Sequence, residues 1–125
     1  PGCSACRIGW EEVRSYAPEK LFIDLCSSDL ARGLREIPWL AAQDGWMDLP
    51  AVKSGEVYLI DHVYFSCPGP RVVDGLEMLA QLTHPDVFSG MIPPDVVLKL
   101  DPIQAKVCLP DDVARCFHPF PPLQA

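Results

Sequence analysis

Two pairs of potential metal ligands stand near the two ends of the chain. Cys3 and Cys6 are separated by two residues, a spacing at which cysteines can clamp zinc or form a redox pair. Cys116 and His118 near the other end could supply two more ligands, and a structural zinc site needs about four. This second pair has an unusual one-residue spacing, and the site forms only if the fold brings both ends together. A small zinc-stabilised domain is therefore one hypothesis.

Other uses of the cysteines depend on their surroundings. A thioredoxin-like redox motif follows a strand and opens a helix, whereas Cys3 is preceded by Pro1 and Gly2. The six cysteines could form three disulfides, but their spacing is not that of a dense secreted scaffold, and a chain of 125 residues can bury a core without such links. We therefore expect mostly free thiols, with Cys26 as a half-buried structural cysteine at the end of a strand.

Motifs for acid–base, nucleophilic or phosphate chemistry are missing from the sequence. Asp61 and Asp74 stand 13 residues apart and do not suggest a carboxylate pair. There is no glycine-rich phosphate loop and no Ser-His-Asp order with motif support. The three histidines do not cluster, although His62 is an alternative ligand contact. We expect a protein that is not an enzyme, with no catalytic residues and no cofactor.

A proline-rich turn stands before the most regular helix of the chain. The stretch YFSCPGPRVV places Tyr64, Phe65 and Ser66 just ahead of a Pro-Gly-Pro-Arg turn, and an amphipathic helix is predicted over residues 71–82. Such a turn could deliver aromatic side chains to the edge of a ligand site. It could equally be a plain connection, in which the aromatic residues pack over the helix end and the prolines set the turn.

Helices and strands alternate in the first two-thirds of the chain. The sequence predicts a helix over residues 10–16, a strand over 20–26, a helix from about residue 29 that Pro38 kinks or ends, and a strand over 56–60. The continuous apolar run of the first strand is typical of strands that are buried on both faces. The alternation of strands and helices favours an α/β fold with a small, mainly parallel sheet.

The last third of the chain is expected to complete this sheet. Residues 95–100 predict a third strand and residues 103–109 a weaker fourth, with Asp101 and Pro102 as the turn between them. The tail HPFPPLQA is rich in proline and is expected to be extended or mobile. The side chains expected to face the sheet from the helices are Val72, Leu76, Leu79, Ala80, Trp39 and Trp46.

Composition and charge exclude several classes of protein. Hydrophobic residues make up 49% of the chain and charged residues 22%, as in one folded globular domain. The net charge of −7 and the isoelectric point near 4.7 disfavour nucleic acid or an anionic membrane as a partner, since both need a basic surface. No apolar run approaches the roughly 18–20 residues that span a bilayer. The chain starts without a Met or a signal-peptide pattern, so we expect a processed or cut piece of a longer protein.

Two stretches between Trp10 and Phe88 carry a resemblance to a known family. The first is IGWEEVRSYAPEKLFIDLC, a helix followed by an AP turn into an apolar strand. The second is LPAVKSGEVYLIDHVYFSCPGPRVVDGLEMLAQLTHP, in which an aromatic pair and PGPR open the last helix and HP closes it. In order and spacing this region resembles the C-terminal lobe of the substrate-binding proteins of cobalamin and iron-siderophore ABC importers. The resemblance covers about two-thirds of the chain, and its most specific part is the block from PGPR to HP.

The resemblance implies a ligand-binding role. Members of that family have two α/β lobes joined by a long helix, hold the ligand between the lobes, and are not enzymes. The partners it implies are a missing N-terminal lobe and a metal-chelate ligand, either a cobalamin or a siderophore. Tyr64 is at the position of a ligand contact, with Phe65 and Ser66 as its neighbours. Many relatives carry an Arg where this chain has Cys67, so one polar anchor is lost here.

The combined expectation is a partial three-layer α/β/α lobe with an added segment. Residues 1–88 are expected to form the incomplete lobe, and residues 89–125 a C-terminal extension without a counterpart in the family. The first alternative is a repurposed lobe that serves protein–protein interaction, with the extension covering a sheet edge or the cleft. An unprotected edge would invite self-association with a second copy of the chain. The second alternative is the zinc-stabilised domain.

Overall fold

The computed structural model describes residues 4, 6–66 and 69–122. Its centre is a four-stranded sheet in the order β1 (Leu21–Asp24), β2 (Val57–Ile60), β3 (Val97–Leu100) and β4 (Phe117–Pro119). β1 runs parallel to β2, whereas β3 is antiparallel to β2 and β4 is antiparallel to β3. The prediction that the first two strands adjoin and point the same way is confirmed, in a sheet that is mixed rather than mainly parallel.

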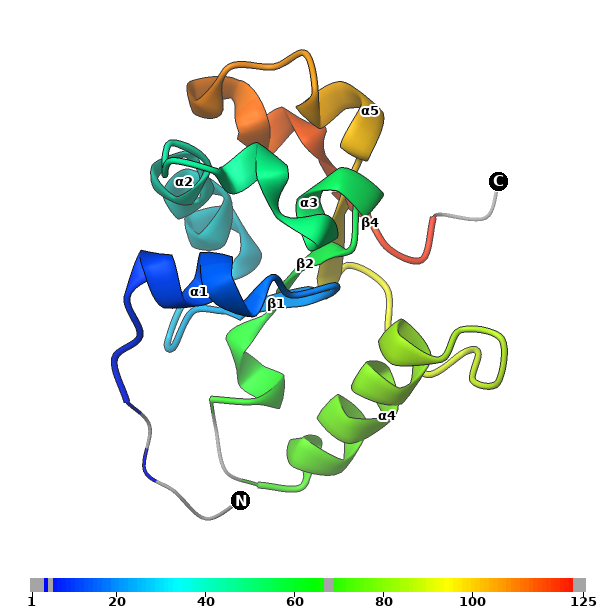
Figure 1. The fold of residues 1–125 in the computed structure, drawn as a ribbon. Helices are drawn as coiled ribbons and strands as arrows, with labels where there is room; N and C mark the ends of the chain where they lie inside the picture. Colours follow the sequence, from blue (N-terminus) through cyan, green and yellow to red (C-terminus); the bar gives the residue numbers. More distant parts are fainter. Residues whose placement is uncertain (1–3, 5, 67–68, 123–125) are drawn as a thin grey trace.

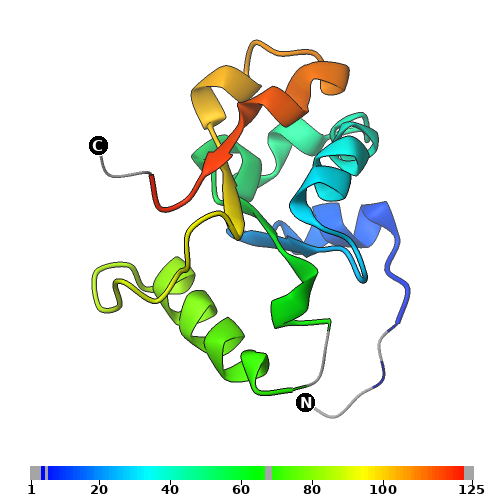
Figure 2. The same ribbon diagram turned by 180° about the vertical axis from the view of Figure 1, so that it is seen from behind.

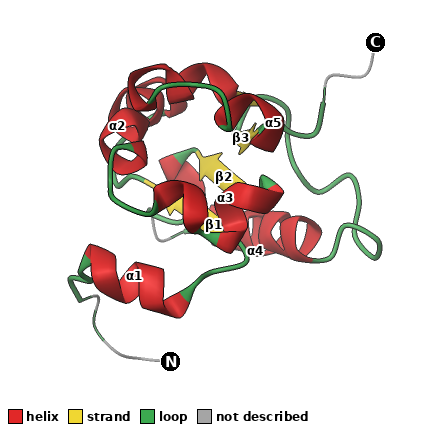
Figure 3. Ribbon diagram, turned by 45° about the horizontal axis from the view of Figure 1, so that its top comes forward, coloured by secondary structure: helices red, strands yellow, loops and turns green. Residues whose placement is uncertain are grey.

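Helices cover both faces of the sheet, so the predicted α/β class is confirmed (Figure 1). α4 (Arg71–Thr83) packs on one face, where Met78 and Leu82 meet Tyr58 and Ile60 of β2. The opposite face carries α2 (Leu30–Ala41), α3 (Pro50–Ser54), α5 (Pro102–Ala105) and, towards the N-terminus, α1 (Trp10–Tyr16). All four residues of β2 are buried, as its uninterrupted apolar run requires of a strand covered on both faces. Figure 3 shows the short strands enclosed by these helices.

α2 begins at a capped end and continues past its internal proline. Asp29 accepts a hydrogen bond from the Arg32 backbone N–H and so caps the helix, which runs through Pro38 to Ala41. The predicted packing of Trp46 is confirmed, since its side chain is 2% exposed and stacks on Trp10. The same prediction for Trp39 is wrong, because this side chain is 71% exposed at the outer face of α2.

The buried face of α4 differs from the predicted stripe. Val72 and Leu76 are exposed, and the residues buried in this helix are instead Gly75, Met78, Gln81 and Leu82. The reason lies in Gly75, which has no side chain and lets the helix lie against the Tyr64 backbone and the Phe65 ring. Periodicity alone favours the larger apolar side chains and does not reveal this close approach.

The C-terminal third supplies two of the four strands. The predicted third strand is confirmed as β3, but a strand over residues 103–109 is wrong. Asp101 accepts hydrogen bonds from two backbone N–H groups and Pro102 occupies the first turn, so this pair starts α5 instead of a strand-to-strand turn.

The fourth strand lies in the tail that was expected to be extended or mobile. β4 pairs with β3, and Phe120 donates its backbone N–H to Val97 at 2.9 Å. The Phe120 ring also packs edge-on against Tyr58. Seen from behind in Figure 2, this last segment lies alongside β3. Residues after 88 thus add β3 beside β2 and β4 beside β3, while the role of this segment as an extension of a family lobe stays a prediction. Within the described residues, no helix has the length and apolar character needed to cross a membrane.

Candidate functional site

The carboxyl ends of β1 and β2 form one edge of the sheet. Because the two strands are parallel, the loop after Asp24 and the loop after Ile60 leave from the same edge, the position at which open α/β sheets bind ligands. The loops are joined by a hydrogen bond in which the Ser66 hydroxyl donates to Asp24 Oδ2 at 2.9 Å. This hydrogen bond connects the two loops, and its donor, Ser66, is one of the residues that the sequence analysis singled out.

The loop after β1 is a tight turn into α2. Ser28 is buried, its backbone N–H donates to Leu25 at 2.9 Å and its hydroxyl donates to the Cys26 carbonyl at 3.3 Å. Ser27 has a left-handed backbone with φ of 58°, a conformation that turns the chain sharply. Cys26 is exposed, so the expectation of a half-buried structural cysteine is wrong.

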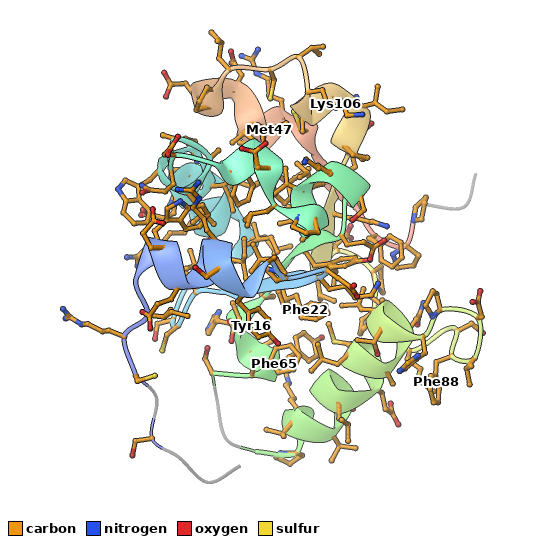
Figure 4. All side chains as sticks on the ribbon, viewed as in Figure 1. Tyr16, Phe22, Met47, Phe65, Phe88 and Lys106 are labelled. Carbon is orange, nitrogen blue, oxygen red and sulfur yellow. The ribbon has the colours of Figure 1, made fainter. Side chains whose placement is uncertain are left out.

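The loop after β2 is a short 3-10 helix, His62–Tyr64, capped by Asp61. The Asp61 carboxylate accepts from the Val63 backbone at 3.1 Å and lies 3.4 Å from His62 Nδ1. Tyr64 is buried in the core between the sheet and α4. Phe65, labelled in Figure 4, is half-buried, and its ring lies beside Gly75 of α4. The two aromatic side chains thus serve the packing of α4 in this structure, and their role as ligand contacts stays a prediction.

A groove of about 520 Å³ lies between β1 and the outer face of α2. Asp24 and Cys26 line it from the strand end, and Arg32, Glu36 and the exposed Trp39 line it from the helix. An exposed indole beside one acidic and one basic side chain suits a flat ligand with polar groups at its rim. Sequence reasoning missed this site. The signal was present in the i, i+4, i+7 spacing of the three helix residues, which places them on one face.

Asp24 is the most informative residue of the groove. Its Oδ2 atom holds Ser66, whereas its Oδ1 atom is buried and has no hydrogen-bond partner among the described residues. A buried acceptor without a partner costs stability. Ser66 does not line the groove itself but holds Asp24, which does. Cys67 lies outside the described residues.

The residues of the zinc hypothesis do not gather in the part of the chain that is described. Cys3 lies outside the described residues. Cys116 contacts Cys108, and the His118 ring is 2.8 Å from the Gln104 side-chain oxygen. Among residues 4, 6–66 and 69–122, no group of three or more His, Cys, Asp or Glu side chains could hold a metal ion.

A second polar cluster lies at the opposite edge of the sheet, around Glu56. Its carboxylate accepts hydrogen bonds from Lys20 and Tyr58 at 2.6 Å and from Lys99 at 3.1 Å. Burial raises the pKa of Glu56, but these hydrogen bonds and the charge of Lys99 outweigh it and lower the pKa to about 2. Burial and the Glu56 carboxylate in turn raise the pKa of Tyr58 well above its usual range. The cluster ties together the chain before β1 and the strands β2 and β3.

A comparison with known proteins adds one observation. Over 86 residues the chain is 31% identical to YvrC of Bacillus subtilis (strain 168), an uncharacterised ABC transporter substrate-binding lipoprotein. The similarity supports the general family of ABC transporter substrate-binding proteins. The matched region is 68% of this chain and 26% of YvrC, so the chain spans about a quarter of that relative's length. No protein-family model matches the chain, and no solved structure matches it. Nothing in the match distinguishes one ligand class from another.

Proposed function

We propose that this chain is the non-catalytic ligand-binding part of an ABC transporter substrate-binding protein. The observation that carries the proposal is the 31% identity to a protein of that description. The site would be the carboxyl edge of β1 and β2 together with the groove beside α2. The groove is open to solvent, so a ligand held there would need a second protein surface to enclose it. The match covers 26% of YvrC, and the rest of that relative is long enough to contain a further lobe.

A metal chelate, either a cobalamin or a ferric siderophore, is the ligand class we propose. The support is the sequence resemblance between residues 10 and 88, and the presence of an exposed indole at the groove. Both ligand types are large and partly flat, and they carry polar groups that the charged rim of Arg32 and Glu36 could meet. In this proposal Ser66 positions the Asp24 carboxylate. Tyr64 and Phe65 hold the loop after β2 in place by packing in the core cluster that includes Met78 and Leu82 of α4.

Binding is best measured with the full parent protein. Cyanocobalamin and a ferric siderophore are titrated separately, with calorimetry for affinity and tryptophan fluorescence for location. Because Trp39 is exposed at the groove whereas Trp46 is buried, binding there should quench the fluorescence of Trp39. The W39F variant should lose most of this quenching. If neither ligand binds the parent protein, the metal-chelate proposal fails, while the broader substrate-binding assignment is tested with other solutes.

The role of the Asp24–Ser66 link is tested by substitution. D24N replaces one acceptor oxygen by a donor and S66A removes the hydroxyl that holds the carboxylate. We expect each to weaken ligand binding by on the order of tenfold, equivalent to about 1.4 kcal/mol. S89A, at an exposed serine far along the chain, is the matched control and should bind as the unaltered protein does. Unchanged affinity in both D24N and S66A would remove this edge from the site.

A protein-interaction role is the second candidate, favoured by an exposed apolar patch on α4. The α4 patch consists of Val72, Val73 and Leu76, and Val73 and Leu76 are 61% and 66% exposed. Apolar side chains that gather on one helix face often mark contact surfaces. Light scattering after size exclusion measures the molar mass, and the double variant V73E/L76E should reduce it if the patch pairs copies of the chain. A monomer at all concentrations would argue against pairing through this patch.

A further inference from the structure

Cys108 and Cys116 form a close pair away from the candidate ligand site. The Cys116 thiol donates a hydrogen bond to Cys108 Sγ, with the two sulfur atoms 3.2 Å apart. Cys108 follows α5, and Cys116 ends the 3-10 helix Pro110–Cys116. Lys106, two residues before Cys108, and Phe65 of the candidate site lie on opposite sides of the sheet in Figure 4. The pair therefore belongs to a different part of the molecule.

The two cysteines differ in their access to solvent. Cys116 is 2% exposed and packs in the core with Val113 and Phe117. Cys108 is half-buried and lines a small cavity of about 70 Å³ together with Leu109 and Pro110. Free volume beside its sulfur lets the Cys108 side chain turn without displacing packed neighbours. Solvent reagents thus meet Cys108 before the buried Cys116, whose sulfur lies in contact with Cys108 Sγ.

We propose that Cys108 and Cys116 are a disulfide site that is oxidised by a small disulfide such as oxidised glutathione. In the first step the Cys108 thiolate attacks one sulfur of the oxidant, breaks its S–S bond and releases one glutathione thiolate. Solvent protonates that thiolate, and Cys116 loses its own proton to solvent as its sulfur becomes the second nucleophile. The Cys116 sulfur then attacks Cys108 Sγ and expels the second glutathione thiolate, which is protonated by solvent. Two electrons leave the cysteine pair, and two molecules of reduced glutathione are formed.

The environment of Cys116 supports this order of attack. Burial, the hydrogen bond to Cys108 and the negative charges of Asp101 and Asp112 raise the pKa of Cys116 to about 12. Its thiol therefore keeps its proton at neutral pH and is a poor first nucleophile, because the thiolate is the reactive form. Once Cys108 carries a mixed disulfide, the fixed contact between the two sulfurs supplies a high effective concentration for the second step.

The disulfide between Cys108 and Cys116 would link two parts of the C-terminal extension. It would join the segment that follows α5 to the 3-10 helix whose Val113 and Cys116 pack in one core cluster with Ile37 and Ala41 of α2. A disulfide that closes this short loop reduces the conformational freedom of the unfolded chain. The two sulfur atoms are already 3.2 Å apart in the folded chain, so they need to move little to form the bond. Oxidation should therefore raise the thermal stability and leave the groove beside β1 unchanged.

The test uses a chain in which the other four cysteines are replaced by serine (C3S, C6S, C26S and C67S). Incubation with oxidised glutathione should reduce the number of titratable thiols from two to none without forming covalent dimers. The melting temperature should rise on the order of 5–10 °C. The same background with C108S and C116S added is the control and should show no shift. If the four-serine chain does not fold, peptide mapping of the oxidised unaltered chain shows the Cys108–Cys116 link or its absence.

The single variants test the order of attack. In the four-serine background, C116S should take up one glutathione at Cys108, whereas C108S should react at least tenfold more slowly because its remaining thiol is buried. Two outcomes would overturn the proposal: a pair that stays reduced in the folded chain under conditions that oxidise it in urea, or a link that forms without any rise in the melting temperature.

Discussion

At the scale of single residues, Glu56 is the side chain on which most polar contacts of the sheet converge. Its carboxylate has a folded-state pKa of about 2, below the ordinary value of 4.5. A lowered pKa of this kind stabilises the fold fully above about pH 4.5, and the contribution is lost as the pH falls towards 2. Acid should therefore weaken the connection between the chain before β1 and the strands β2 and β3.

We predict that E56Q lowers the free energy of unfolding by about 2 kcal/mol at pH 7, because Lys20 and Lys99 lose their counter-charge in a half-buried setting. The difference between E56Q and the unaltered chain should shrink between pH 5 and pH 2. Urea unfolding at pH 7, 5 and 3 measures both effects, with E77Q at an exposed position of α4 as the control. A difference that stays constant over this range would show that the charge of Glu56 does not stabilise the fold.

Residue roles were only partly predictable from the sequence. Ser66 was singled out as the neighbour of a ligand contact, and that role stays a prediction, whereas its hydrogen bond to Asp24 was not foreseen. The exposure of Trp39 was not predictable, because an indole is buried by default and only its tertiary surroundings decide otherwise. The contact between Cys108 and Cys116 escaped notice for a related reason. Their spacing of eight residues matches no motif, and a turn after α5 has to bring them together.

At the scale of elements, the contact between α4 and the loop after β2 decides how the candidate edge is supported. A Cβ added at Gly75 would lie 2.9 Å from the Tyr64 backbone oxygen and 3.0 Å from the Phe65 ring. A backbone oxygen in a capped 3-10 helix has little freedom to give way. The helix itself would have to move away from the sheet.

We predict that G75A destabilises the chain by about 1–3 kcal/mol, although alanine is the better helix former by about 1 kcal/mol. G69A is the matched control, because a Cβ there meets no atom of the described residues within 4 Å. Urea unfolding compares the two variants, and ligand titration of the parent protein reports any shift of the Tyr64 loop. If G75A is as stable as G69A, α4 does not rest on that loop in the way described.

The elements that were predicted well are those with strong local patterns. β2 has an uninterrupted apolar run, and α4 begins directly after Pro70, which marks its start. β4 could not be predicted, since it is three residues long, contains Pro119 and owes its position to pairing with β3. The buried face of α4 was misjudged because a glycine contact has no hydrophobic signal.

At the scale of the whole molecule, the sheet unites both parts of the chain. β1 and β2 come from the region that resembles the substrate-binding family, whereas β3 and β4 come from the extension. The boundary at residue 88 stays a prediction as a family boundary. In the fold, however, Tyr58 and Leu59 of β2 pair with Lys99 and Leu98 of β3, so the core is shared.

We predict that a chain ending at Ser89 does not fold cooperatively, because it lacks β3, β4 and the side chains Val113, Cys116 and Phe117 that complete the core. Urea unfolding should give a broad transition, and the near-ultraviolet circular dichroism of the aromatic residues should be lost. A chain ending at Pro122 is the control and should unfold like the unaltered protein. A sharp transition in the shorter chain would mean that residues 1–89 fold independently.

The two edge strands of the sheet, β1 and β4, differ in how readily another strand could pair with them. On the β4 side, the edge strand is three residues long and contains Pro119, which lacks a backbone N–H, and two further prolines follow it, features that disfavour pairing with another strand. β1 contains no proline and among the described residues pairs only with β2. A polypeptide that lengthens this sheet by strand pairing would find the unpaired side of β1, the strand whose carboxyl end also lines the groove beside Trp39.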